Sequence, residues 1–123
     1  MVRFIKRCSA FLPAGLREKL QKNWHTLRWY SNQFVHYEPE FQILDQWVSR
    51  NDWVIDVGAN VGVFTARLSE LVGPAGRVLA FEPVPTTFRI LVHNSRLFRF
   101  PNVSFLNVAL SDVAAEVGMA IPD

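Results

Sequence analysis

Cysteine is nearly absent from this chain of 123 residues, and long apolar runs and paired histidines are missing altogether. Because Cys8 is the one cysteine, no disulfide can form within the chain, and a cytoplasmic location is expected. No apolar run approaches the ~20 residues that span a bilayer, so an integral membrane protein is not expected. His25, His36 and His93 lack the spacing of paired ligands, so no metal site is expected.

The composition is that of an ordinary globular protein, with 50% hydrophobic and 20% charged residues. It excludes a disordered or collagen-like chain. The net charge of +2 is unevenly distributed, because the first 30 residues hold seven Lys or Arg side chains and a single Glu. This basic leader suits an anionic partner, or it is simply the solvated side of a helix.

Two helices are predicted before residue 50. Apolar side chains recur every three or four residues over 15–30, and such a helix either packs on the following domain or makes peripheral contact with an anionic membrane. A second, shorter helix is predicted from Pro39 to Val48, with proline in its first turn. Its buried face is expected to contain Phe41, Leu44, Trp47 and Val48.

From Asn51 onward, strand patterns alternate with helix patterns. The apolar run 53–57 is typical of a strand that is buried on both faces. Further strands are predicted at 78–81 and 103–108, separated by helices over 64–72 and from a cap at Thr86 or Thr87 to about Phe98. The inward side of the last helix is expected to contain Phe88, Leu91 and Val92. This order predicts an α/β fold with a parallel sheet.

The first strand passes into the following helix through the segment Asp56-Val57-Gly58-Ala59-Asn60-Val61-Gly62. Glycines there allow a tight turn and a close approach to a ligand, and free N–H groups at the helix start favour anionic groups. Glu82 ends the second strand, 24 residues after Gly58. A carboxylate at that distance can accept hydrogen bonds from both hydroxyls of a ribose. The pattern predicts a nucleoside cofactor.

Two features favour S-adenosylmethionine over NAD. Asn60 stands where the dinucleotide fingerprint has its second glycine. The negative charge of Asp56 disfavours a pyrophosphate but suits the sulfonium and ammonium groups of S-adenosylmethionine. A P-loop is excluded because no Gly-Lys-Ser/Thr follows the glycines.

The same residues have plainer interpretations. Gly58 and Gly62 could serve only the turn and the packing of the helix, and Glu82 could be a solvated strand end. Asn107 could equally be a turn former.

Three segments in order resemble the cofactor motifs of the FkbM-type methyltransferases, within the class I group that depends on S-adenosylmethionine. They are 56–62, Phe81-Glu82-Pro83 and Asn107-Val108-Ala109-Leu110-Ser111-Asp112. The upstream Tyr37-Glu38-Pro39-Glu40 also resembles that family, so the likeness runs from about Tyr37 to Ile121. It implies a Rossmann-like sheet and O-methylation of a small-molecule or glycan acceptor, with no nucleic-acid partner.

The resemblance also implies which residues bind the cofactor. The methionine part would lie against Asp56, Gly58, Ala59, Asn60 and Gly62. Glu82 would hold the ribose, and Asn107, Val108 and Ala109 would line the adenine. No catalytic residue is implied, because direct displacement at a sulfonium depends mainly on orientation.

A complete domain of this class needs roughly 160 residues at typical element lengths. We therefore expect a basic helical segment over 1–50 and, over 51–123, the N-terminal half of a methyltransferase domain with about three strands. Such a chain would lack the acceptor-binding half and would have at most a partial cofactor site. The first strand would have a bare edge through which chains could self-associate. The alternative is a noncatalytic fragment whose basic helix binds a membrane or a protein partner.

Overall fold

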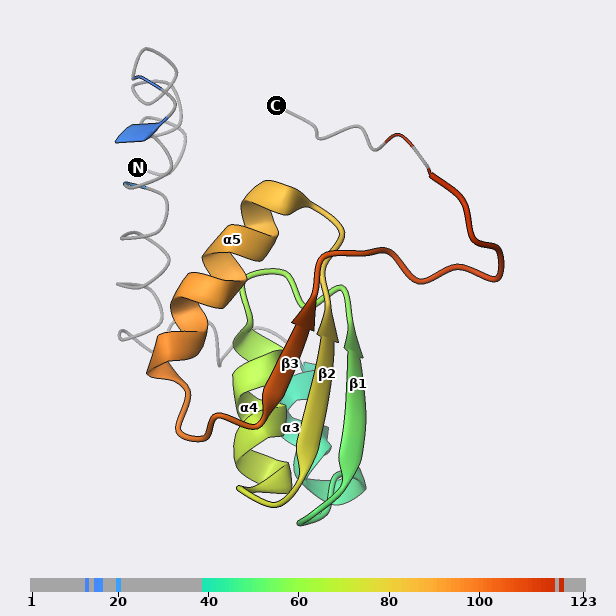
Figure 1. The fold of residues 1–123 in the computed structure, drawn as a ribbon. Helices are drawn as coiled ribbons and strands as arrows, with labels where there is room; N and C mark the ends of the chain where they lie inside the picture. The colour runs from blue at the N-terminus through green and yellow to red at the C-terminus, as the bar shows by residue number, and fades with distance from the viewer. Residues whose placement is uncertain (1–12, 14, 17–19, 21–38, 117, 119–123) are drawn as a thin grey trace.

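The computed structural model describes residues 39–116 together with residues 13, 15, 16, 20 and 118. In chain order its elements are α3 (Pro39–Trp47), β1 (Trp53–Val57), α4 (Val63–Val72), β2 (Arg77–Phe81), α5 (Pro85–Asn94), the 3-10 helix η1 (Ser95–Leu97) and β3 (Val103–Leu106). The strands form one parallel sheet in the order β1-β2-β3 (Figure 1). The predicted α/β fold with a parallel sheet is confirmed.

The predicted helix over 15–30 lies mostly outside the described residues. Gly15, Leu16 and Leu20 are described, and all three are helical. Membrane contact through this segment therefore stays a prediction. In the part of the chain that the structure describes, no helix is long and apolar enough to cross a membrane.

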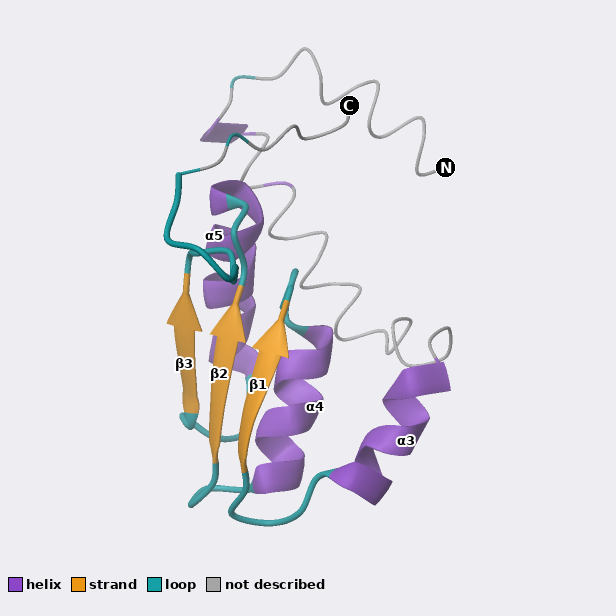
Figure 2. Ribbon diagram, turned by 90° about the vertical axis from the view of Figure 1, so that its right-hand side faces the viewer, coloured by secondary structure: helices purple, strands orange, loops and turns teal. Residues whose placement is uncertain are grey.

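The helices cover one face of the sheet, as Figure 2 shows. Leu68 and Val72 of α4 pack against Val78 of β2. Leu91 of α5 packs against Ala80, two residues farther along the same strand. Since alternate residues of a strand point to the same face, both helices lie on one side of β2. The core is therefore a single layer between the sheet and these helices.

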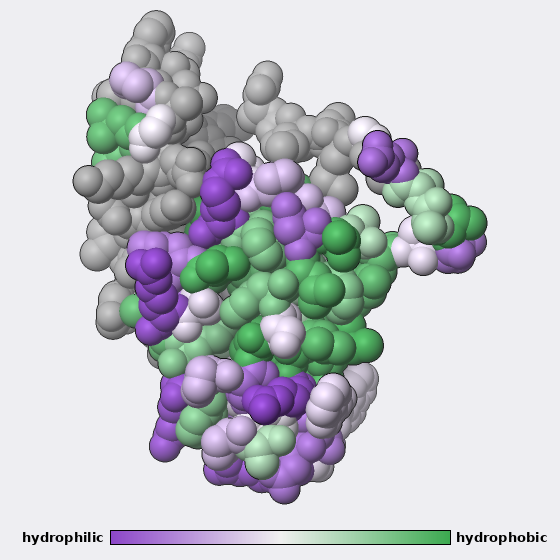
Figure 3. All heavy atoms as spheres, in the orientation of Figure 1, coloured by the Kyte–Doolittle hydropathy of each residue, from purple (hydrophilic) through white to green (hydrophobic). Residues whose placement is uncertain are grey.

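On its other face β1 is not covered by the described part of the chain, so the expectation that β1 is buried on both faces is wrong. Trp53, Ile55 and Val57 are 74%, 61% and 64% exposed. Figure 3, which looks onto this face, shows apolar side chains gathered over the sheet. A continuous apolar run predicts burial on both faces only where a second layer exists, and α3, α4 and α5 all lie on the opposite side.

The Ile55→Lys chain should self-associate less than the wild type. Ile55 lies on the exposed face of β1, which is also an edge strand of the described sheet, and a lysine on such an edge disfavours pairing with another chain. Its free energy of unfolding should change by no more than about 0.5 kcal/mol because the side chain is exposed. Analytical ultracentrifugation over a range of concentrations measures the association. Val54→Lys is the matched control, because it places the same charge on the helix side of the same strand. Since Val54 packs against the core there, the free energy of unfolding of this variant should fall.

α3 packs against α4, but through a narrower face than predicted. The rings of Phe41 and Phe64 meet edge to face, with centroids 5.4 Å apart. Leu44 also packs against the core beneath α4, and Asp45 pairs with Arg67 at 2.6 Å. The expectation that Trp47 is buried is wrong, since it is 76% exposed. Trp47 lies about a quarter turn around the helix from the centre of the packed stripe.

α5 begins earlier than predicted and without a side-chain cap. Its first residue is Pro85, and Val84 occupies the cap position with no side-chain hydrogen bond. The prediction of a cap at Thr86 or Thr87 is therefore wrong, because a proline preset for the first turn starts the helix instead. Val92, predicted to face inward, is exposed. The buried residues of this helix are Ile90, Leu91 and Asn94.

Candidate functional site

The loop after β1 is tied directly to the end of β2. The N–H groups of Gly58 and Ala59 both donate to the carbonyl oxygen of Phe81, each at 2.9 Å. The N–H of Asn60 donates to Oε2 of Glu82, also at 2.9 Å. Because the strands are parallel, their carboxyl ends lie at one edge of the sheet, and residues 58–60 and 81–82 meet there.

Glu82 is the central carboxylate of this edge and is only 6% exposed. Its Oε1 accepts a hydrogen bond from the N–H of Val84 at 2.9 Å, while Oε2 is held by Asn60. Its own N–H donates to the carbonyl of Leu106 at 3.0 Å, which joins β2 to β3. Glu82 is therefore buried and fixed, and it is not a solvated strand end. Each carboxylate oxygen keeps a second lone pair for a further donor.

The backbone N–H groups of this loop are used within the fold, whereas the expectation of free N–H groups concerns the start of α4 at Val63 and stays a prediction. The N–H groups of residues 58–60 are not free for an anionic ligand, because all three donate to acceptors at the end of β2. The N–H of Gly62 donates to Ala59 within the same turn. Closing the turn onto β2 uses these donors, so an anionic group would have to bind at the first turn of α4 instead.

The two glycines of the loop have different surroundings. Both have left-handed backbones, with φ of 80° at Gly58 and 97° at Gly62. A Cβ built on Gly58 would meet no atom within 4 Å, so this position leaves open space beside the backbone. A Cβ on Gly62 would lie 2.7 Å from Cδ1 of Leu91 and 3.2 Å from Cζ of Phe98. Gly62 therefore serves the packing of the loop on α5.

Asp56 lies on the helix side of the sheet, beside Ala80 and next to the loop. Its Oδ2 accepts a hydrogen bond from the hydroxyl of Thr65 at 2.6 Å. Burial raises the pKa of Asp56 above its usual range, the negative charge of Glu82 raises it further, and the Thr65 hydrogen bond opposes both. Two carboxylates therefore share this end of the sheet, and a cation between them would relieve the cost of ionising both.

The Asp56→Asn chain should be more stable than the wild type at pH 7, and the difference should shrink as the pH falls. Since the pKa of Asp56 is higher in the folded than in the unfolded chain, the folded state favours the protonated form. The stabilising contribution is present below the unfolded pKa and is lost as pH rises through the folded value. Urea denaturation of both chains between pH 4 and 8 measures the difference. A constant difference over that range would contradict the assignment.

The segment after β3 reaches the same edge through one side chain. β3 ends at Leu106, two residues earlier than predicted. The amide Nδ2 of Asn107 donates to the carbonyls of Glu82 and Pro83 at 2.8 and 3.1 Å, so it holds the turn that follows β2. Val108 and Ala109 are exposed.

Two polar residues that shape the site were missed in the sequence. Thr65 is fully buried and holds Asp56. Asn94 is also fully buried, and its Nδ2 donates to the carbonyl of Val61 at 2.9 Å. Their position in the sequence could have indicated this role. Each is a polar residue within the apolar stripe of a helix that packs on the sheet, and a buried polar side chain needs a hydrogen-bond partner.

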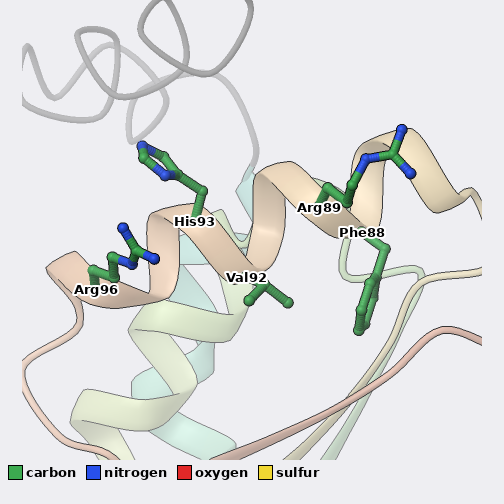
Figure 4. A pocket seen from close by; sticks show the side chains of 5 residues that line it. All are labelled: Phe88, Arg89, Val92, His93 and Arg96. Carbon is green, nitrogen blue, oxygen red and sulfur yellow. The ribbon is translucent and has the colours of Figure 1, made fainter. Parts of the chain in front are cut away.

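A pocket on α5 does not coincide with this edge. It is lined by Phe88, Arg89, Val92, His93 and Arg96 (Figure 4), and none of the predicted site residues is among them. Within the described residues there is no group of three His, Cys, Asp or Glu side chains that could hold a metal ion. The carboxyl edge of the sheet is therefore the candidate site.

Solved structures of methyltransferases share this fold. A SAM-dependent methyltransferase from Aquifex aeolicus superposes with a TM-score of 0.52 at 24% identity, over 61% of this chain and 40% of its own. A protein-L-isoaspartate O-methyltransferase gives a TM-score of 0.52 at 26% identity, over 58% of this chain and 23% of its own. The chain thus spans less than half the length of these enzymes. No curated protein matches the sequence.

The sequence itself matches one protein family. The methyltransferase FkbM domain covers residues 56–122, which is more than half of the chain and contains all the predicted site residues. The three parallel strands and intervening helices agree with part of a class I methyltransferase fold. The protein therefore belongs to the FkbM methyltransferase family, whose members depend on S-adenosylmethionine.

Proposed function

We propose that this chain binds S-adenosylmethionine at the carboxyl edge of its sheet. The observation that carries the proposal is the buried carboxylate of Glu82, which is held by two backbone N–H groups and still has a free lone pair on each oxygen. In the described residues, no Arg or Lys side chain forms an ion pair with it. Two ribose hydroxyls fit this acceptor.

The other residues of the edge suit the rest of the cofactor. Asp56 supplies a second carboxylate for the ammonium group, and Gly58 leaves space for close approach to the backbone. Ala59, Asn60 and Gly62 complete the loop, and Asn107, Val108 and Ala109 border the adenine. When bound, S-adenosylmethionine supplies an electrophilic methyl group. The protein residues hold and orient the cofactor, which is the main requirement of direct displacement.

We propose that the reaction is O-methylation of a small-molecule or glycan acceptor in the cytoplasm, without a nucleic-acid partner. The likeness to a protein-L-isoaspartate O-methyltransferase supports transfer to oxygen. The chain would divide into a basic helical segment over 1–50 and a methyltransferase segment over 51–123. α3 is then the part of the first segment that packs on the second.

Isothermal titration calorimetry of the 123-residue chain with S-adenosylmethionine tests the proposal. We expect a dissociation constant in the micromolar range, equivalent to about 8 kcal/mol of binding free energy. That result would overturn the expectation of an only partial cofactor site. NAD serves as the control ligand and should give no heat of binding. A chain that is folded by circular dichroism and binds no S-adenosylmethionine would refute the proposal.

A further inference from the structure

We propose that Asn94 is a positioning residue that holds the loop 58–62 in the shape required for cofactor binding. Asn94 is the last residue of α5 and is fully buried. Its Nδ2 donates to the carbonyl of Val61 at 2.9 Å, across 33 residues of sequence. This inference rests on the proposed function, and it assigns a role to a residue far from the glycine motif in sequence.

The amide of Asn94 is only half satisfied. Its Oδ1 is buried and, among the described residues, has no hydrogen-bond partner. A buried acceptor without a partner is costly, so a leucine of similar size would avoid that penalty. The one bond that the amide does make is to the loop. Asn94 therefore makes the fold less stable than an apolar residue would, and the interaction that it provides is the hydrogen bond to Val61.

A restraint on Val61 acts at the centre of the turn, because the residues on both sides of it have left-handed backbones. Asn60 has a φ of 49°, and Gly62 has a φ of 97°. Asn60 also presents its N–H to Glu82 at 2.9 Å. The Asn94 bond fixes the peptide plane that joins Val61 to Gly62. The N–H of Asn60 lies two peptide planes earlier, so the backbone torsions of Asn60 and Val61 connect the two. Without the bond from Asn94, these torsions are less restrained, and the N–H of Asn60 can turn away from Glu82.

A matched control exists at the other end of α4. Asn102 is 2% exposed, and its Nδ2 donates to the carbonyls of Ser69 and Gly73 at 3.1 and 2.7 Å. These carbonyls lie at the carboxyl end of α4, away from the loop. Replacing Asn102 by leucine removes a buried amide of the same type without touching residues 58–62.

The test compares Asn94→Leu and Asn102→Leu in the full chain by two measurements. Calorimetric titration with S-adenosylmethionine should give a dissociation constant about tenfold weaker for Asn94→Leu and unchanged for folded Asn102→Leu. Amide hydrogen exchange of the ligand-free chains should be faster at Asn60 in Asn94→Leu alone. Asn102→Leu should lose more thermal stability, because it breaks more bonds.

Equal binding and equal exchange at Asn60 in the wild type and Asn94→Leu would overturn the inference. If leucine does not fit at this position, Asn94→Ala removes the same donor without added bulk and should give the same two changes. A wild-type chain that binds no S-adenosylmethionine would refute the proposed function instead. In that case the exchange at Asn60 still decides whether Asn94 holds the loop.

Discussion

Glu82→Gln should weaken the binding of S-adenosylmethionine by up to about 100-fold, because it removes one hydrogen bond to a charged acceptor. Such a bond is worth about 1.5–3 kcal/mol, and 1.4 kcal/mol is a factor of ten. Glutamine keeps one acceptor oxygen and replaces the other by an NH2 group. That group would face the N–H of Asn60 or Val84, which both donate to the carboxylate in the wild type. Calorimetric titration measures the loss.

The matched control for this variant is Glu70→Gln. Glu70 lies on the outer side of α4, where it pairs with Arg67 at 3.5 Å and is about half exposed. Its replacement should leave both binding and stability nearly unchanged, since surface ion pairs contribute little. If Glu82→Gln is folded and binds as tightly as Glu70→Gln, Glu82 is not the ribose ligand.

Gly62→Ala should lower the free energy of unfolding by about 3 kcal/mol. The added Cβ would lie 2.7 Å from Cδ1 of Leu91, a buried side chain of α5, and overpacking of this kind costs roughly 1–3 kcal/mol. The left-handed backbone of this residue adds about 1–2 kcal/mol for any residue with a Cβ. Urea denaturation monitored by circular dichroism measures the change.

Gly58→Ala measures the cost of the left-handed backbone without the cost of overpacking. It has the same kind of backbone, but no atom lies within 4 Å of the added Cβ. We expect a loss of only about 1 kcal/mol in stability, with a larger effect on S-adenosylmethionine binding because the methyl group fills the space beside the backbone. Equal losses of stability in the two alanine variants would show that the side chains of Leu91 and Phe98 move away from the new Cβ without a cost in stability.

The sequence predicted the strand and helix order well because those patterns are local. The apolar run at 53–57 and the turn at residues 73–76 predicted β1 and the end of α4 to the residue. The wrong predictions concern burial, which depends on what packs against each side chain. Trp47 and Val92 belong to apolar patterns but are exposed, because the burial of a helix position depends on where the neighbouring layer ends.

The site shows the same division between local and nonlocal information. The glycine loop and the acidic residue after β2 were recognisable from spacing, since a parallel strand pair brings two consecutive loops to one edge. The bond of Asn94 to Val61 joins segments 33 residues apart, and no local pattern carries that pairing. Thr65 likewise became visible only when α4 placed its hydroxyl against Asp56.

By itself, the sequence determined the α/β order, the parallel sheet and the family, because strand and helix periods and motif spacing are properties of the chain alone. Only the tertiary structure decided that one face of β1 is exposed, that the loop N–H groups bind the end of β2, and that Glu82 is buried between two backbone donors. These outcomes depend on which donors and apolar surfaces meet across the fold. Burial and hydrogen-bond satisfaction are settled there, and not along the chain.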